Sequence, residues 1–131
     1  MLIILVSIAL IGGGAAYYVI HKGQESKDPS IDDILKTSVD VAEITTNLKG
    51  DDYIKISFKI QTDSKAAKDE LTKRDFQVKN IIIEELSEKK AHDLQGKVGK
   101  LQLENMLRSK INELMQDGKV VKVYITESLL Q

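Results

Sequence analysis

The sequence contains no cysteine and no tryptophan, one proline and two histidines. Without cysteine the chain can form no disulfide, thiolate metal site or iron–sulfur cluster, and it has no thiol nucleophile. Two histidines leave few members for a protein-only metal site or a histidine-based catalytic relay. The 19 Lys and Arg residues nearly balance the 20 Asp and Glu residues. The composition therefore disfavours nucleic-acid binding and an acidic disordered tail.

Familiar site motifs are missing as well. The sequence has no phosphate-binding loop, no nucleophile elbow, no HExxH motif and no Ca²⁺ loop. The pair His92-Asp93 looks most like a site, but adjacent residues on a helix point about 100° apart and no second cluster supports them. We therefore predict a protein that is not an enzyme and that uses no cofactor, metal or small-molecule substrate. An enzyme built on this pair is kept only as a minor alternative.

The first segment, Leu2 to Ile20, carries no charged residue. As a helix, about 19 residues would rise roughly 28 Å, close to the thickness of a bilayer's hydrocarbon core. We predict a transmembrane anchor over residues 1–20. A cleaved secretory signal is the alternative, because Gly14-Ala15-Ala16 could serve as its cleavage site. The missing basic start and the apolar residues that continue to Ile20 favour the anchor.

Small residues recur within this run at helical spacing. Ala9 and Gly13 form one pair and Gly12 and Ala16 a second, and such pairs let two membrane helices approach closely. The alternative is that small residues are simply common in membrane helices. Basic residues follow the run, which naively places the rest of the chain in the cytoplasm. Because the run begins directly after Met1, we expect the true start to lie upstream and take the charge rule as uninformative.

The rest of the chain is predicted to be a polar linker over 21–38, with a short helix near the membrane, followed by one α+β domain over 39–131. Apolar and polar residues alternate over Tyr53–Thr62, which predicts a strand with one buried face and one solvent-exposed face. Its partner is expected at 43–48, across a turn at 49–52. Helical composition predicts one helix over 65–94, bent near Asp75. The triple Ile81-Ile82-Ile83 falls within that helix.

The C-terminal part is predicted as a loop, a helix and a strand. Gly96 and Gly99 indicate a loop over 95–100, and a second amphipathic helix ends at Asp117-Gly118. The last run, 119–131, alternates again, with Val121, Val123 and Ile125 expected on one side. Two strands, two helices and a strand predict a small antiparallel sheet with helices packed on one face.

These segments together resemble a known family. The chain is similar to the flagellar basal-body-associated protein FliL in its N-terminal anchor and in the turn followed by the strand YIKISFKIQT. The segment from Arg74-Asp75-Phe76 to Ile83 is similar to that family as well. The helix that ends at Gly118 and the closing residues 123–131 agree as well. The chain departs from the family where Ile125 and Ser128 stand in place of larger residues, and in the missing basic residues before the anchor.

The resemblance implies a non-enzymatic, single-pass protein of the bacterial inner membrane at the flagellar basal body. It implies an extracytoplasmic domain of stomatin/prohibitin type, which would form a homo-oligomeric ring around the motor's stator units. The expected role is support of flagellar rotation, swimming or swarming motility, and chemotaxis. The alternative is a membrane-anchored cell-envelope binding or assembly domain unrelated to the motor.

A ring needs one surface of a copy to meet a different surface of the next copy. The wet sheet face and a charged helix face are the candidate interfaces, because opposite charges would attract across them. The first is represented by Tyr53, Lys55 and Lys59, and the second by Glu84, Glu85 and Glu88.

Overall fold

The structure is a computed structural model that describes residues 28–131. The chain divides into two units, Met1–Ser30 and Ile31–Gln131, and all the helices and strands described below belong to the second. The predicted anchor over 1–20, with Ala9, Gly12, Gly13 and Ala16, lies outside the described residues. Within residues 28–131, no helix combines the length and apolar character needed to cross a bilayer.

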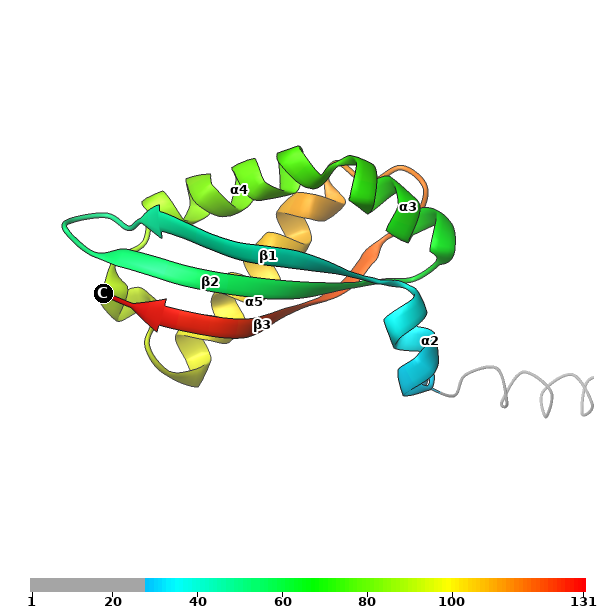
Figure 1. Cartoon of the computed structure of the whole chain (residues 1–131), viewed down its shortest axis with the longest axis horizontal. Helices are drawn as coiled ribbons and strands as arrows, with labels where there is room; N and C mark the ends of the chain where they lie inside the picture. Colours follow the sequence, from blue (N-terminus) through cyan, green and yellow to red (C-terminus); the bar gives the residue numbers. More distant parts are fainter. Residues whose placement is uncertain (1–27) are drawn as a thin grey trace, which may run out of the picture. The chain divides into compact units, whose positions relative to one another are not determined.

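Three antiparallel strands form the sheet (Figure 1). They are β1 (Ser38–Asn47), β2 (Tyr53–Thr62) and β3 (Val120–Leu130), with β2 in the centre. The predicted bounds of β2 are confirmed, and its partner across the turn is β1. Its four apolar side chains are buried on one face, because period 2 sends every second residue to that side.

All the helices except α2 (Ile31–Lys36) cover that buried face of the sheet. In chain order the others are α3 (Lys65–Lys73), α4 (Asp75–Ser87), the 3₁₀ helix η1 (Ala91–Leu94) and α5 (Gly96–Asn112). Figure 1 shows α4 running along β1 and α5 crossing behind the strands. The core lies between the two layers and is built from Phe58, Ile82, Leu86, Leu103, Leu107 and Ile111, among others. The predicted α+β fold is confirmed.

The predicted single helix over 65–94 is corrected to α3, α4 and η1. The chain breaks at Arg74, close to the expected bend, because the Arg74 N–H closes the end of α3 on the carbonyls of Glu70 and Leu71. Helix α4 ends at Ser87, earlier than the end predicted for the single helix over 65–94. There the Lys89 carbonyl accepts a hydrogen bond at 2.8 Å from the N–H of Lys49 in the β1–β2 turn. That contact between distant segments is not visible in local composition.

The predicted loop over 95–100 is also wrong, since α5 already begins at Gly96. Gly99 does not break this helix. A Cβ at Gly99 would collide with the backbone carbonyl oxygen of Asp93 in η1, so this glycine lets η1 pack directly on the first turn of α5.

Val123 and Ile125 lie on the predicted face of β3, but Val121 does not. The register shifts between the pairs Gln61–Lys122 and Thr62–Val120, which leaves Val121 as the extra residue of a bulge. A bulge reverses the alternation beyond it, so Val120 is buried and Val121 is 45% exposed.

Candidate contact surfaces

The open face of the sheet carries the first predicted interface set. Tyr53, Lys55 and Lys59 all lie on β2, on the side away from the core, and the Tyr53 residue is 48% exposed. The Lys59 ammonium pairs with the Asp40 carboxylate of β1 at 3.1 Å. Lys55 stands beside a shallow hollow that Glu43 and Leu129 also line. This face is therefore a flat, polar surface with exposed aromatic and aliphatic carbon.

Aromatic and basic groups continue across this face onto β3. The Tyr124 hydroxyl donates to the amide oxygen of Gln61 at 3.1 Å, and the Lys122 ammonium lies 5.2 Å from the centre of the Tyr124 ring. A cation over an aromatic face is attracted by the ring quadrupole. These contacts hold the Tyr124 side chain in place between its neighbours.

Glu84 and Glu85 of the second set lie on α4, in the helix layer, and Glu88 is the residue that caps its C-terminal end. Glu85 is turned toward α5, where the Lys110 ammonium meets its carboxylate at 3.0 Å. The hydrogen bond and the charge of Glu85 raise the pKa of Lys110 above its ordinary value. Glu84 and Glu88 are exposed. The structure thus places the two predicted sets on opposite layers of the domain and does not bring them together within one copy.

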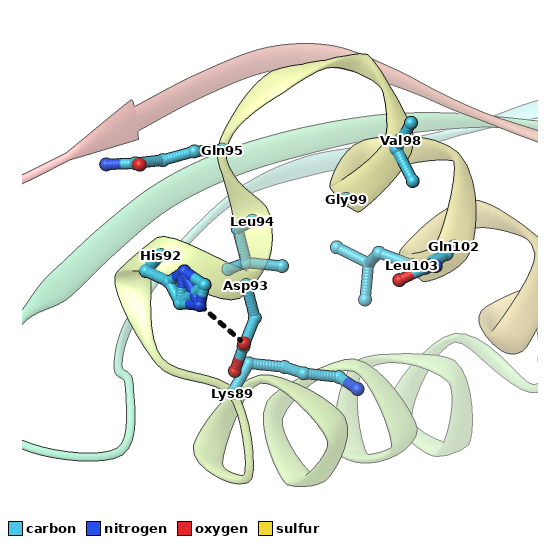
Figure 2. A pocket seen from close by; sticks show the side chains of 9 residues that line it. All are labelled: Lys89, His92, Asp93, Leu94, Gln95, Val98, Gly99, Gln102 and Leu103. Carbon is cyan, nitrogen blue, oxygen red and sulfur yellow. Dashed lines mark ion pairs between the residues drawn. The ribbon is translucent and has the colours of Figure 1, made fainter.

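His92 and Asp93 line a hollow of about 440 Å³ (Figure 2). The His92 Nε2 lies 3.8 Å from an Asp93 oxygen, and the His92 side chain is 83% exposed. The other Asp93 oxygen accepts the backbone N–H of Lys90 at 2.9 Å. That bond, which fixes the entry to η1, holds the pKa of Asp93 below its ordinary value. Asp93 therefore serves the turn that leads into η1.

Among the described residues, no cluster of three or more histidine, aspartate or glutamate side chains is placed to hold a metal ion. The hollow beside His92 is open and is lined by lysine and glutamine side chains together with Leu94 and Val98. Small-molecule sites are usually concave and mostly apolar. The geometry favours contacts between surfaces over chemistry in a pocket.

Sequence analysis missed one carboxylate that links segments far apart in the sequence through hydrogen bonds. Glu70 on α3 is only 8% exposed, and it accepts the backbone N–H of Gln116 at 2.9 Å and that of Asp117 at 2.7 Å. It also accepts from the Arg74 Nε at 2.9 Å. The Asp117 N–H leads the groups that hold the pKa of Glu70 below its ordinary value. No local signal marks this contact, because the partners are 46 and 47 residues apart.

The outer edge of β3 is closed by side chains of α5. The Asn112 amide donates to the Val120 carbonyl at 3.0 Å and accepts the Val120 N–H at 2.7 Å. The Glu104 carboxylate accepts the N–H of Ile125 at 2.8 Å. An open strand edge is a template for pairing with other chains, so these bonds remove part of that hazard.

The α+β domain with its open sheet face spans the part of the chain that matches a known family. Residues 38–131 match the family described as "Flagellar basal body-associated protein FliL". The chain is also 48% identical over 121 residues to the "Flagellar protein FliL" of Bacillus subtilis (strain 168). That match covers 91% of this chain and 86% of the relative.

The chain belongs to the FliL family. FliL proteins are non-enzymatic proteins of the flagellar basal body and act in motility, so the predictions of the family and of a protein without catalytic activity are confirmed.

Proposed function

We propose that this FliL-family chain is a single-pass membrane protein whose domain lies on the extracytoplasmic side, assembles into a ring of copies, and associates with the stator units of the flagellar motor. In this role it supports rotation, and through it swimming, swarming and chemotaxis. The observation that carries the proposal is the family match over residues 38–131, which contain all three strands. We also propose that the domain is related to stomatin/prohibitin-type domains.

The open face of the sheet is the proposed contact surface for the motor partner. On this face Tyr53 is exposed and Lys55 is half-buried. Glu84 on α4 and Glu88 at its C-terminal cap form a second, acidic contact surface on the opposite layer. Charged groups at a contact steer association and make its strength depend on salt.

Co-purification from gently solubilised membranes tests the motor association. Stator subunits should be recovered with the full-length chain. Recovery of cell-envelope proteins without any motor component would instead support an anchored envelope-binding domain. Reversing one charge, Lys55→Glu, should reduce the recovered stator protein severalfold, whereas Lys65→Glu on α3 should not. Equal recovery with both variants would exclude the open face as the stator contact.

The anchor is proposed to pack against another membrane helix through Ala9, Gly12, Gly13 and Ala16. A close helix contact needs small residues, so Gly12→Leu and Gly13→Leu should weaken association in the membrane. Ser7→Leu, elsewhere in the same run, is the matched control. If all three variants associate equally in a membrane two-hybrid assay, the small residues have no packing role.

A further inference from the structure

The short helix α2 presents apolar side chains to solvent. None of its six residues is buried, and Ile31 and Leu35, four positions apart on one side, are 67% and 49% exposed. A helix of this length is not stable by itself, because nucleation is costly. It must therefore be held by the rest of the domain.

Hydrogen bonds fix the end of α2 to the sheet. The Thr62 hydroxyl donates to the Thr37 carbonyl at 2.6 Å, and the Thr62 N–H donates to the same oxygen at 3.0 Å. The Ser38 hydroxyl donates to the Ile34 carbonyl at 2.6 Å. Figure 1 shows α2 projecting from the end of the sheet. The apolar side of α2 is thus held in a fixed position as a ridge, formed by Ile31, Asp32 and Leu35.

A depression elsewhere on the same domain differs from the apolar ridge, because charged side chains line it. It has a volume of about 160 Å³ and lies between α5 and β3, lined by Glu104, Asn105, Arg108, Val121, Lys122 and Val123. It is smaller than the roughly 300–1,000 Å³ of typical small-molecule sites. The bulge in β3 turns Val121 outward on its rim. The Glu104 carboxylate accepts the Ile125 N–H and keeps its negative charge, so the depression is basic only because the two cations Arg108 and Lys122 outnumber it.

We infer that the ridge of one copy docks into the depression of the next copy, with Leu35 beside Val121 and Asp32 facing Arg108. The charges are complementary, since the ridge is acidic and the depression is basic. The exposed fractions of Leu35 and Val121 show that neither covers the other within one copy. Because the two patches differ, the contact is heterologous and repeats from copy to copy, closing a ring when the rotation allows it.

A bilayer is a poorer occupant for the ridge. Bacterial membrane surfaces that carry anionic lipid attract basic segments, whereas α2 carries two aspartates, Asp32 and Asp33, against one lysine, Lys36. The inference rests on the proposed function only in assuming that copies assemble side by side, and it adds the residues that make the contact.

Cysteine cross-linking tests the contact, because the natural chain has no cysteine. The full-length variants Leu35→Cys, Val121→Cys and the double variant are expressed in cells, and membranes are exposed to a mild oxidant. We expect the double variant to give a ladder of disulfide-linked oligomers and each single variant to stay monomeric. Dimers from Leu35→Cys alone would show a symmetric contact and overturn the inference. So would the absence of a ladder while an amine-reactive cross-linker still captures oligomers.

Charge exchange gives an independent readout. Arg108→Asp and Asp32→Arg, each placed in the double-cysteine background, should lower the ladder at least tenfold, and the two together should restore it. Asn105→Asp, beside Arg108 on the rim, should retain most of the ladder. No restoration would overturn the Asp32–Arg108 pairing.

The two proposals fail in distinguishable ways. Absence of any oligomer by amine cross-linking contradicts the ring itself, and this inference with it. Failure to recover stator subunits contradicts the motor association alone and leaves the ladder unaffected.

Discussion

At the scale of single residues, Glu70 connects the end of α3 to the turn before β3. Glu70→Ala removes the acceptor of the Gln116 and Asp117 N–H groups and leaves both without their partner. An unpaired buried donor costs more than the bond itself contributes, so the variant should unfold at a clearly lower temperature. Glu88→Ala, at an exposed glutamate directly after α4, is the control and should melt like the natural domain. Calorimetry of both variants decides the matter, and equal melting temperatures would contradict the role of Glu70.

The same carboxylate should make stability depend on pH. The Asp117 N–H, with smaller effects from Gln116 and Arg74, holds the pKa of Glu70 below its ordinary value, while burial opposes them. A pKa lowered by folding adds stability that is fully present above the ordinary glutamate pKa of about 4.3 and is lost as pH falls through the folded pKa. Urea unfolding between pH 7 and pH 3 should therefore show a steeper acid loss for the natural domain than for Glu70→Gln. Parallel pH profiles would refute this.

At the scale of elements, the edge of β3 depends on a side chain of the neighbouring helix. Glu104→Ala leaves the Ile125 N–H unpaired at that edge and should lower the free energy of unfolding by about 1–3 kcal/mol. It should also raise self-association at high protein concentration, since an open edge can pair with another strand. Glu104→Gln keeps an acceptor oxygen and should lose less on both measures. Urea unfolding and light scattering of the two variants provide the comparison.

Substitutions at two glycines allow the energetic cost of backbone strain to be compared with the cost of close packing. Gly50, in the β1–β2 turn, has φ of 102° with open space around it, so Gly50→Ala should cost only the backbone strain, about 1–3 kcal/mol. Gly118, before β3, has φ of 146°, and a Cβ there would lie 2.6 Å from both the Ala67 Cβ and the Asp63 Oδ1. Gly118→Ala should therefore cost more than Gly50→Ala in chemical unfolding. The reverse order would show that the approach of α3 to this turn is not tight.

The elements that could be predicted are those set by local pattern. The bounds of β2 follow from strict alternation over 53–62, and α3 begins directly after Ser64, whose hydroxyl accepts the Ala67 N–H. The misses are set by contacts between distant segments. The end of α4 meets the β1–β2 turn, Gly99 packs on η1, and the bulge at Val121 changes which β3 residues face the core.

The candidate contact surfaces were predictable to a similar extent. Alternation alone assigned Tyr53, Lys55 and Lys59 to the open face. Composition could not show that Lys110 engages Glu85 or that Asp40 engages Lys59, because each ion pair joins two elements. The depression beside Arg108 depends on the position of α5 against β3, and no local motif encodes it.

At the scale of the whole molecule, a thin two-layer domain leaves one sheet face uncovered. Only one face of the three strands is buried under the helices. A domain of this kind leaves much of its surface exposed to solvent, and the hollows on its described part are shallow. The uncovered face is the proposed contact surface, and the chain belongs to a family that acts in the flagellar basal body without catalysis.

The proposed extracytoplasmic position of the domain can be tested on the intact molecule. Because the chain has no natural cysteine, a single Lys119→Cys gives one exposed thiol, in the segment between α5 and β3. A maleimide that cannot cross membranes should label it in intact spheroplasts. Ile111→Cys, fully buried in the core, should be labelled only after denaturation.

The order of labelling then decides on which side of the membrane the domain lies. Reaction of Lys119→Cys before lysis places the domain outside the cytoplasm, where a stator-associated ring would have to form. Reaction only after lysis places it in the cytoplasm and contradicts the proposed location. The family match to a basal body protein would stand in either case, because it rests on residues 38–131 and not on the direction of the anchor.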